Sequence, residues 1–111
     1  MLPQLNRALT LEGPVTVPDG AGGYAKSWTV LGTLWAEIAA GSGRDTAGED
    51  VTLSTVPYRI TVRAAPVGAP SRPIPKQRLR EGTRVFHILA VTERDADARF
   101  LTCFAREEEP L

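Results

Sequence analysis

Residues 51–63 read VTLSTVPYRITVR, and this stretch shows most clearly what kind of fold the chain adopts. Tyr58, Ile60 and Val62 alternate with two arginines and a threonine. A period of two places successive side chains on opposite faces of an extended chain. The pattern therefore predicts a half-buried β-strand.

A second strand is predicted for residues 9–17, LTLEGPVTV. Leu9 and Leu11 share one face, and Thr10 and Glu12 take the other. Pro14 donates no backbone hydrogen bond, so this strand should lie at an edge, bend, or pair on one side only.

The residues that follow predict a hairpin. Residues 18–23, PDGAGG, contain Asp-Gly and Gly-Gly pairs, which tolerate positive φ and suit a turn of more than minimal length. Residues 24–40, YAKSWTVLGTLWAEIAA, are rich in aromatic and β-branched side chains. Gly32 indicates either two strands or one strand with a bulge.

The carboxy-terminal half predicts a second hairpin. Residues 84–94, RVFHILAVTER, and 99–106, RFLTCFAR, are strand-like and are separated by a short polar turn. Residues 64–76 contain four prolines and predict an extended, semi-rigid surface loop. Residues 107–111, EEEPL, predict a frayed acidic tail.

One internal segment lacks the residues that build a core. Residues 39–50, AAGSGRDTAGED, combine glycine with small and charged side chains, so they predict a mobile loop. Ser42 could cap one short helical turn over residues 44–47, which glycine weakens. Together these elements predict a mainly β fold: five or six antiparallel strands in a small barrel or sandwich, with a long loop and one short helix.

Length and composition limit the function classes. The chain has 111 residues, no net charge, 42% apolar residues and one cysteine. These values predict a single domain that folds without a disulfide, and they give no support for a general attraction to nucleic acid or membranes. There is neither a run of about 20 apolar residues nor a signal-peptide pattern at the amino end, so we expect a cytoplasmic protein with no membrane partner.

Catalytic and metal sites are not expected. Cys103, His87 and Asp95 could be imagined as a nucleophilic set, but no sequence signature supports it, and His87 suits a packed ring. Asp95 and Asp97 lack the further oxygen ligands of a calcium loop. Residues 20–23, GAGG, lack the Lys-Ser or Lys-Thr pair of a phosphate-binding loop. We therefore expect no enzyme activity, no cofactor and no metal.

Basic residues are concentrated in one part of the chain. Residues 59–84 carry seven basic residues and one acid, a balance of +6 against −6 for the rest. Three interpretations stay open: self-assembly against an acidic neighbouring surface, contact with a DNA backbone, and unpatterned surface charge. The candidate residues are Arg59, Arg63, Arg72, Lys76, Arg78, Arg80 and Arg84.

Several stretches, in order, resemble the head-tail joining or head-closure proteins of tailed phages, prophages and gene transfer agents. PDGAGGYAKSWTVLGTLWAEI, residues 18–38, is similar to the family's Asp-Gly-x-Gly-Gly, Trp and Trp-Ala-Glu-Val run. YRITVR, residues 58–63, is similar to its His-Arg-Val-Thr-Ile-Arg pattern, with Tyr58 in place of histidine. The remaining matches are LNRALTLEGPV (5–15), SGRD (42–45) and TRVFHILAVTERDADARFLTCFARE (83–107). Residues 64–76 are more proline-rich than is usual in the family.

The resemblance implies a single β-barrel domain that forms a dodecameric ring between the portal or adaptor protein and the tail of a virion-like particle. It implies that a loop closes the channel around packaged double-stranded DNA, and residues 41–51 are the candidate by position. The amino-terminal segment, residues 1–7, is expected to contact neighbouring subunits. The candidate channel residues are Gly41, Ser42, Gly43, Arg44, Asp45, Gly48, Glu49 and Asp50.

A different class of function also fits the residues. A small barrel could bind single-stranded nucleic acid, with the basic stretch following the backbone and Trp28, Trp35 or Tyr58 stacking on bases. Quenching of tryptophan emission by oligonucleotides, with a steep dependence on salt, would indicate this alternative.

Overall fold

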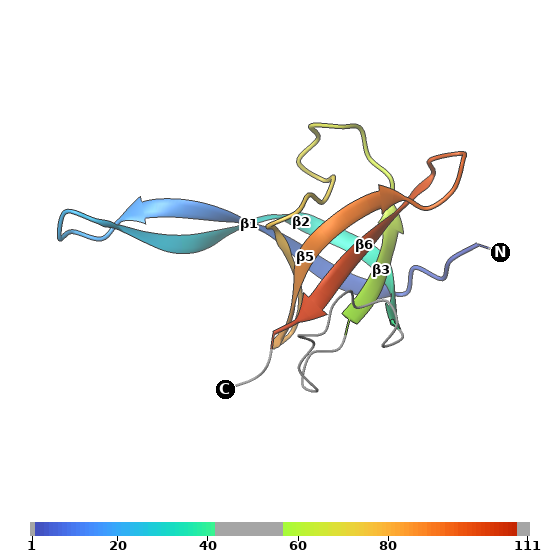
Figure 1. The fold of residues 1–111 in the computed structure, drawn as a ribbon, viewed down its shortest axis with the longest axis horizontal. Helices are drawn as coiled ribbons and strands as arrows, with labels where there is room; N and C mark the ends of the chain where they lie inside the picture. The colour runs from blue at the N-terminus through green and yellow to red at the C-terminus, as the bar shows by residue number, and fades with distance from the viewer. Residues whose placement is uncertain (1, 42–56, 109–111) are drawn as a thin grey trace, which may run out of the picture.

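The computed structural model describes residues 2–41 and 57–108, and within them the chain folds as a closed barrel of six antiparallel strands (Figure 1). The strand order around the barrel is β1-β2-β3-β6-β5-β4, and β4 pairs back onto β1 to close it. The strands are β1 (Arg7–Pro18), β2 (Tyr24–Ala40), β3 (Pro57–Arg63), β4 (Arg78–Glu81), β5 (Arg84–Glu93) and β6 (Phe100–Glu107). This confirms the predicted mainly β, antiparallel barrel.

The core follows from the alternation along each strand. Ile60 and Val62 of β3 face inward, as their spacing predicts, and Leu9 and Leu11 do the same from β1. Burying each such side chain stabilises the fold by roughly 2 kcal/mol. The full core cluster is Leu9, Leu11, Ala36, Ile60, Val62, Leu79, Phe86, Ile88, Leu101, Cys103 and Ala105.

A bulge decides where the first hairpin leaves the barrel. Leu11 pairs with Gly32 and Glu12 pairs with Val30, so Leu31 is an extra residue in β2. The backbone of Gly32 has a φ of 156°, which side-chain-bearing residues rarely adopt. Residues 24–40 therefore form one strand with a bulge, one of the two predicted alternatives.

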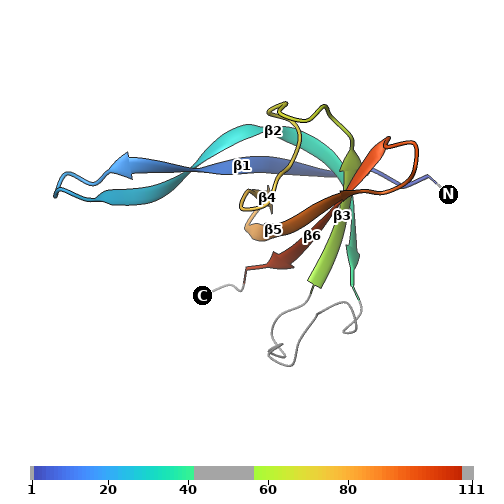
Figure 2. The ribbon, with the colours of Figure 1, turned by 45° about the horizontal axis from the view of Figure 1, so that its top comes forward.

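Beyond this bulge, β1 and β2 continue as a two-stranded ribbon that projects far from the barrel (Figures 1 and 2). We call residues 13–31 the arm. The β1–β4 ladder ends at Glu12, so Pro14 lies where β1 pairs with β2 alone, as its missing donor requires. The molecule measures 52 × 35 × 24 Å, and the arm accounts for its long dimension.

The arm ends in the predicted glycine-rich turn. Asp19 Oδ1 accepts hydrogen bonds from the backbone N–H groups of Ala21, at 2.8 Å, and Gly23, at 3.0 Å. These bonds hold the pKa of Asp19 below its usual value.

The proline-rich loop is present but is not extended. The N–H of Arg72 bonds to Ala69 O and the N–H of Gln77 bonds to Ile74 O, so the loop runs as successive turns. Pro70 and Pro75 occupy the second position of these two turns, where proline presets the required φ. Pro73 is fully buried, so the loop is anchored on the barrel.

Two further features differ from the predictions, and one prediction falls outside the described residues. The four-residue strand β4 had no predicted counterpart. The acidic tail does not fray at its start, because Glu107 is the last residue of β6 and the N–H of Glu108 bonds to Val85 O at 2.7 Å. The described residues contain no helix, and the helical turn predicted for residues 44–47 lies outside them, as do residues 51–56 of the predicted strand.

Candidate functional site

A cluster of charged and aromatic side chains joins the arm to the barrel. Glu12 of β1 is 5% exposed, although it lies on the outer face of its strand. Arg78 Nε donates to Glu12 Oε1 at 2.7 Å, and Arg80 Nη2 donates to Glu12 Oε2 at 3.0 Å. We call Glu12, Arg78 and Arg80, together with Trp28 of the arm, the root cluster.

The two arginines keep this carboxylate ionised. Burial by itself raises the pKa of Glu12, but the hydrogen bonds from Arg78 and Arg80 outweigh burial and leave the pKa below its ordinary value. Charge-assisted hydrogen bonds of this kind are stronger than neutral ones. The root of β1 is therefore tied to β4 by side chains as well as by the backbone ladder.

Trp28 links the arm to the same cluster. The Arg78 guanidinium lies 4.1 Å from the centre of the Trp28 ring, and Lys26 Nζ lies 5.1 Å from it. His87 meets Trp28 edge-on at 6.1 Å and contacts Glu108 Oε1 through Nε2 at 2.8 Å. Trp28 thus anchors the root of the arm against side chains on the outer wall of β4 and β5.

Two further ion pairs lock the barrel closed. Arg84 Nε donates to Glu107 Oε2 at 2.8 Å, and this pairing raises the pKa of Arg84 and lowers that of Glu107. Arg7 Nε donates to Glu81 Oε2 at 2.7 Å and so joins β1 to β4. Glu107 had been expected to be solvated with the rest of the tail.

The basic stretch does not form one exposed surface. Arg78, Arg80 and Arg84 are committed to carboxylates of β1 and β6. Arg72 donates to the carbonyl of Ala65 within its own loop. The stretch also includes Arg59, Arg63 and Lys76, which are exposed.

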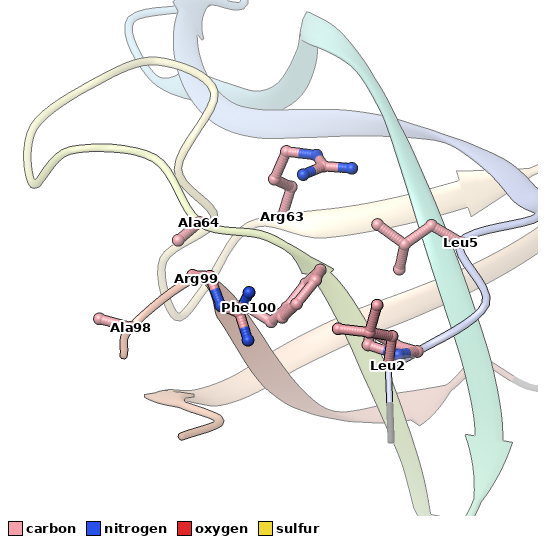
Figure 3. A pocket seen from close by; sticks show the side chains of 8 residues that line it. Leu2, Leu5, Arg63, Ala64, Ala98, Arg99 and Phe100 are labelled. Carbon is pink, nitrogen blue, oxygen red and sulfur yellow. The ribbon is translucent and has the colours of Figure 1, made fainter. Parts of the chain in front are cut away.

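Arg63 lines a hollow beside the amino-terminal segment (Figure 3). Leu2, Leu5 and Phe100 supply apolar walls, and Arg63 and Arg99 supply positive charge. Arg63 also lies 5.9 Å from the centre of the Phe100 ring. The amino-terminal segment therefore forms part of this hollow, with Gln4 N–H bonded to Glu37 Oε2 at 2.9 Å.

The residues considered for chemistry are not brought together. Cys103 faces the core, and burial raises the pKa of its thiol to about 12, which leaves it protonated and unreactive. His87 lies on the outer wall against Trp28, and Asp97 contacts Arg99 at 3.7 Å. Within residues 2–41 and 57–108 no group of three or more His, Cys, Asp or Glu side chains could hold a metal ion.

The positions of the aromatic side chains give little support to the alternative function, in which bases of single-stranded nucleic acid stack on Trp28, Trp35 or Tyr58. Trp28 is covered by Arg78 and His87, and Tyr58 packs edge-on against Phe86 at 5.2 Å. Trp35 is 59% exposed but lies on the wall of β2 rather than in a row of aromatic rings. No helix in the described part of the chain is long and apolar enough to span a membrane.

The candidate channel loop can be followed only at its first residue. Gly41 N–H bonds to Pro57 O at 2.8 Å, so both ends of the segment start from adjacent strands β2 and β3. Ser42, Gly43, Arg44, Asp45, Gly48, Glu49 and Asp50 lie outside the described residues.

The fold and its surfaces define a small β-barrel protein with a projecting two-stranded arm, and comparison with known proteins places it more closely. The model of the phage head completion protein family matches residues 1–108. The chain belongs to the phage head completion protein family.

Two solved structures share the fold. A chain in the virion of a native gene transfer agent particle is 59% identical, with a TM-score of 0.79, and the match covers 97% of this chain and 98% of that one. The solution structure of a protein from Shigella flexneri 2a is 23% identical, with a TM-score of 0.70 over 97% and 96% of the two chains, and shows the shared fold alone. No curated protein sequence matches.

These comparisons confirm the family that the sequence resembled. The family is described as one of phage head completion proteins, that is, of proteins of the phage head. Local sequence patterns do not predict the root cluster or the arm. The signal available was Glu12 among apolar residues, but its partners lie 66 and 68 residues away.

Proposed function

We propose that this chain is a connector subunit that forms a ring beneath the portal or adaptor protein, helps to close the DNA channel and docks the tail. Membership of the phage head completion family carries this proposal. The 59% identical relative within a gene transfer agent virion supports it, because that relative is part of an assembled particle.

The ion pairs on the barrel surface support a structural role for the protein in an assembly. Glu12, Glu81 and Glu107 each hold an arginine from another strand, so the barrel is cross-braced on its surface. A braced barrel is preorganised for binding, which reduces the entropy lost on assembly.

A DNA-closing role for residues 41–51 rests on the family resemblance and on the position of this segment between β2 and β3. A subunit lacking residues 41–48 should still enter particles, because every residue of the core cluster lies outside this segment. Its particles should retain less DNA. The measurement is nuclease-protected DNA per particle, and retention equal to that of the wild type would contradict the channel role.

The connector role itself is tested by removing the chain from the producing cell. Heads should then fill with DNA but lack tails, and adding the purified chain to these heads should restore tail attachment. Electron microscopy of the particles provides the readout. Normally tailed particles formed without the chain would overturn the proposal.

A further inference from the structure

The inner face of the arm continues the core stripe of β1 beyond the end of the barrel. Leu9, Leu11 and Gly13 are buried, and Val15 and Val17 follow them with the same period of two. Inside the barrel the opposite wall covers this stripe. Past Gly13 the described chain covers it only in part, and Val15 and Val17 are 37% and 40% exposed.

The neighbouring strand leaves room beside these valines. Val15 lies opposite Ser27 and Val17 lies opposite Ala25, so small side chains flank the valine ridge. The other face of the arm is different, because there Trp28 is covered by Arg78 and His87. The arm therefore has one face that contacts its own barrel at Trp28, although Tyr24 and Val30 on that face are 72% and 60% exposed, and a second face that carries the valine ridge.

An apolar hollow extends the valine ridge at the root of the arm. Val15 and Leu31 form one side, and Ile74 and Pro75 of the proline-rich loop form the other. Its volume is about 490 Å³, which is ample for large apolar side chains. Ile74 is 50% exposed, so this hollow is also uncovered in the single subunit.

A matching pair of large side chains protrudes elsewhere on the same molecule. The β5–β6 register shifts between Ile88 and Ala90, so Leu89 is the extra residue of a bulge and is 57% exposed. Phe104 lies opposite Ala90 and is 37% exposed. Bulges re-aim side chains, and this one turns a leucine to solvent beside a phenylalanine.

We propose that the valine ridge of the arm and the hollow at its root receive Leu89 and Phe104 from the β5–β6 wall of a second copy of this chain. Figures 1 and 2 show the arm leading away from its own barrel, so its outer part does not lie on the β5–β6 wall of the same subunit. The hollow at its root is nearer to that wall, because Lys76 and Gln77, which line the hollow, are hydrogen-bonded to Ile88. The two surfaces are different patches, so the contact is heterologous, the kind that closes rings when the rotation permits. This inference rests on the proposed connector function.

The dimensions suit this arrangement. Residues 13–18 of the arm span roughly 20 Å at the usual rise per strand residue. That length is comparable with the smallest dimension of the molecule, 24 Å, so one arm can lie across the side of one neighbour. A two-stranded ribbon is marginally stable alone, and a neighbouring wall would give it the third layer of contacts that it lacks.

Disulfide cross-linking in assembled particles tests the contact directly. The double variant Val15→Cys with Leu89→Cys should give a ladder of covalent oligomers under mild oxidation, and each single variant should stay monomeric on a denaturing gel. The native Cys103 is fully buried and protonated, so it should remain silent. A dimer from Val15→Cys alone would mean arm-to-arm contact and would overturn the proposal.

Charge substitution provides a second test. Val17→Asp buries a carboxylate in the contact, so incorporation into particles should fall at least tenfold. The matched control is Thr16→Asp, which adds the same charge at the adjacent position on the opposite face of the arm and should keep more than half of wild-type incorporation. Circular dichroism should show both variants folded.

The outcomes separate the two proposals. If the wild-type chain is absent from particles, the connector function fails. If the wild type is incorporated, Val17→Asp is incorporated equally well and the double cysteine variant gives no ladder, the arm contact fails and the connector function stands.

Discussion

At the scale of single residues, Glu12 shows how the described structure departs from local sequence reasoning. The alternation of β1 correctly places Glu12 on the outer face, which predicts a solvated carboxylate. Arg78 and Arg80 come from a strand that is distant in sequence, and they cover it. Local periodicity contains no information on which distant side chains will meet, so this contact could not be predicted from the sequence.

Replacing Glu12 with glutamine should destabilise the barrel by about 2 kcal/mol, because two arginines lose a charged partner in a mostly buried site. The measurement is the free energy of unfolding in urea at neutral pH. Glu81→Gln, in a more exposed pair, serves as the comparison and should cost less. Equal losses of unfolding free energy for the two variants would contradict the claim that Glu12 stabilises the barrel more than Glu81 does.

Lowering the pH should remove the stability that the ionised Glu12 carboxylate contributes. The folded-state pKa of Glu12 lies below its ordinary value of 4.5, so the carboxylate contributes its full stability above about pH 4.5, and this is lost as the pH falls through the folded-state pKa. The difference in unfolding free energy between wild type and Glu12→Gln should therefore shrink as the pH is lowered toward about 3. A difference that stays constant over this range would show that Glu12 does not act through its charge.

At the scale of elements, the long strands were predictable and the short one was not. Residues 9–17, 84–94 and 99–106 alternate over many positions, and they appear as β1, β5 and β6. β4 reads RLRE and has a single buried apolar side chain, Leu79, so its pattern is too short to detect. It forms because β1 and β5 lie on either side of it and pair with its backbone.

The β4–β5 turn provides a test of this closing element. Gly82 has a φ of 59°, so Gly82→Ala should cost about 1 kcal/mol of stability through backbone strain. Thr83→Ala, at the next turn position, is the control, because Thr83 is not among the described residues with positive φ. Thermal unfolding of the two variants provides the measurement. A Gly82→Ala protein as stable as the control would show that the turn can adopt another conformation.

At the scale of the whole molecule, the sequence predicts the barrel and the family but not the shape. Turn residues such as Asp19 mark a hairpin, yet they do not say that it continues past the barrel. That outcome depends on the Leu31 bulge and on where β4 stops pairing with β1, both of which are properties of the closed sheet. The arm and the root cluster exist only because of this shape, so local sequence patterns do not predict them. Those patterns indicate the basic stretch instead.

The proposed function requires the chain to act as one member of a ring at the head opening, and imaging the head-tail junction of purified particles tests this most directly. Averaged density should show copies of the six-stranded barrel in a closed ring on the channel axis between portal and tail, with each arm lying on its neighbour. A single copy off the axis, or barrels located only at other positions in the particle, would contradict it.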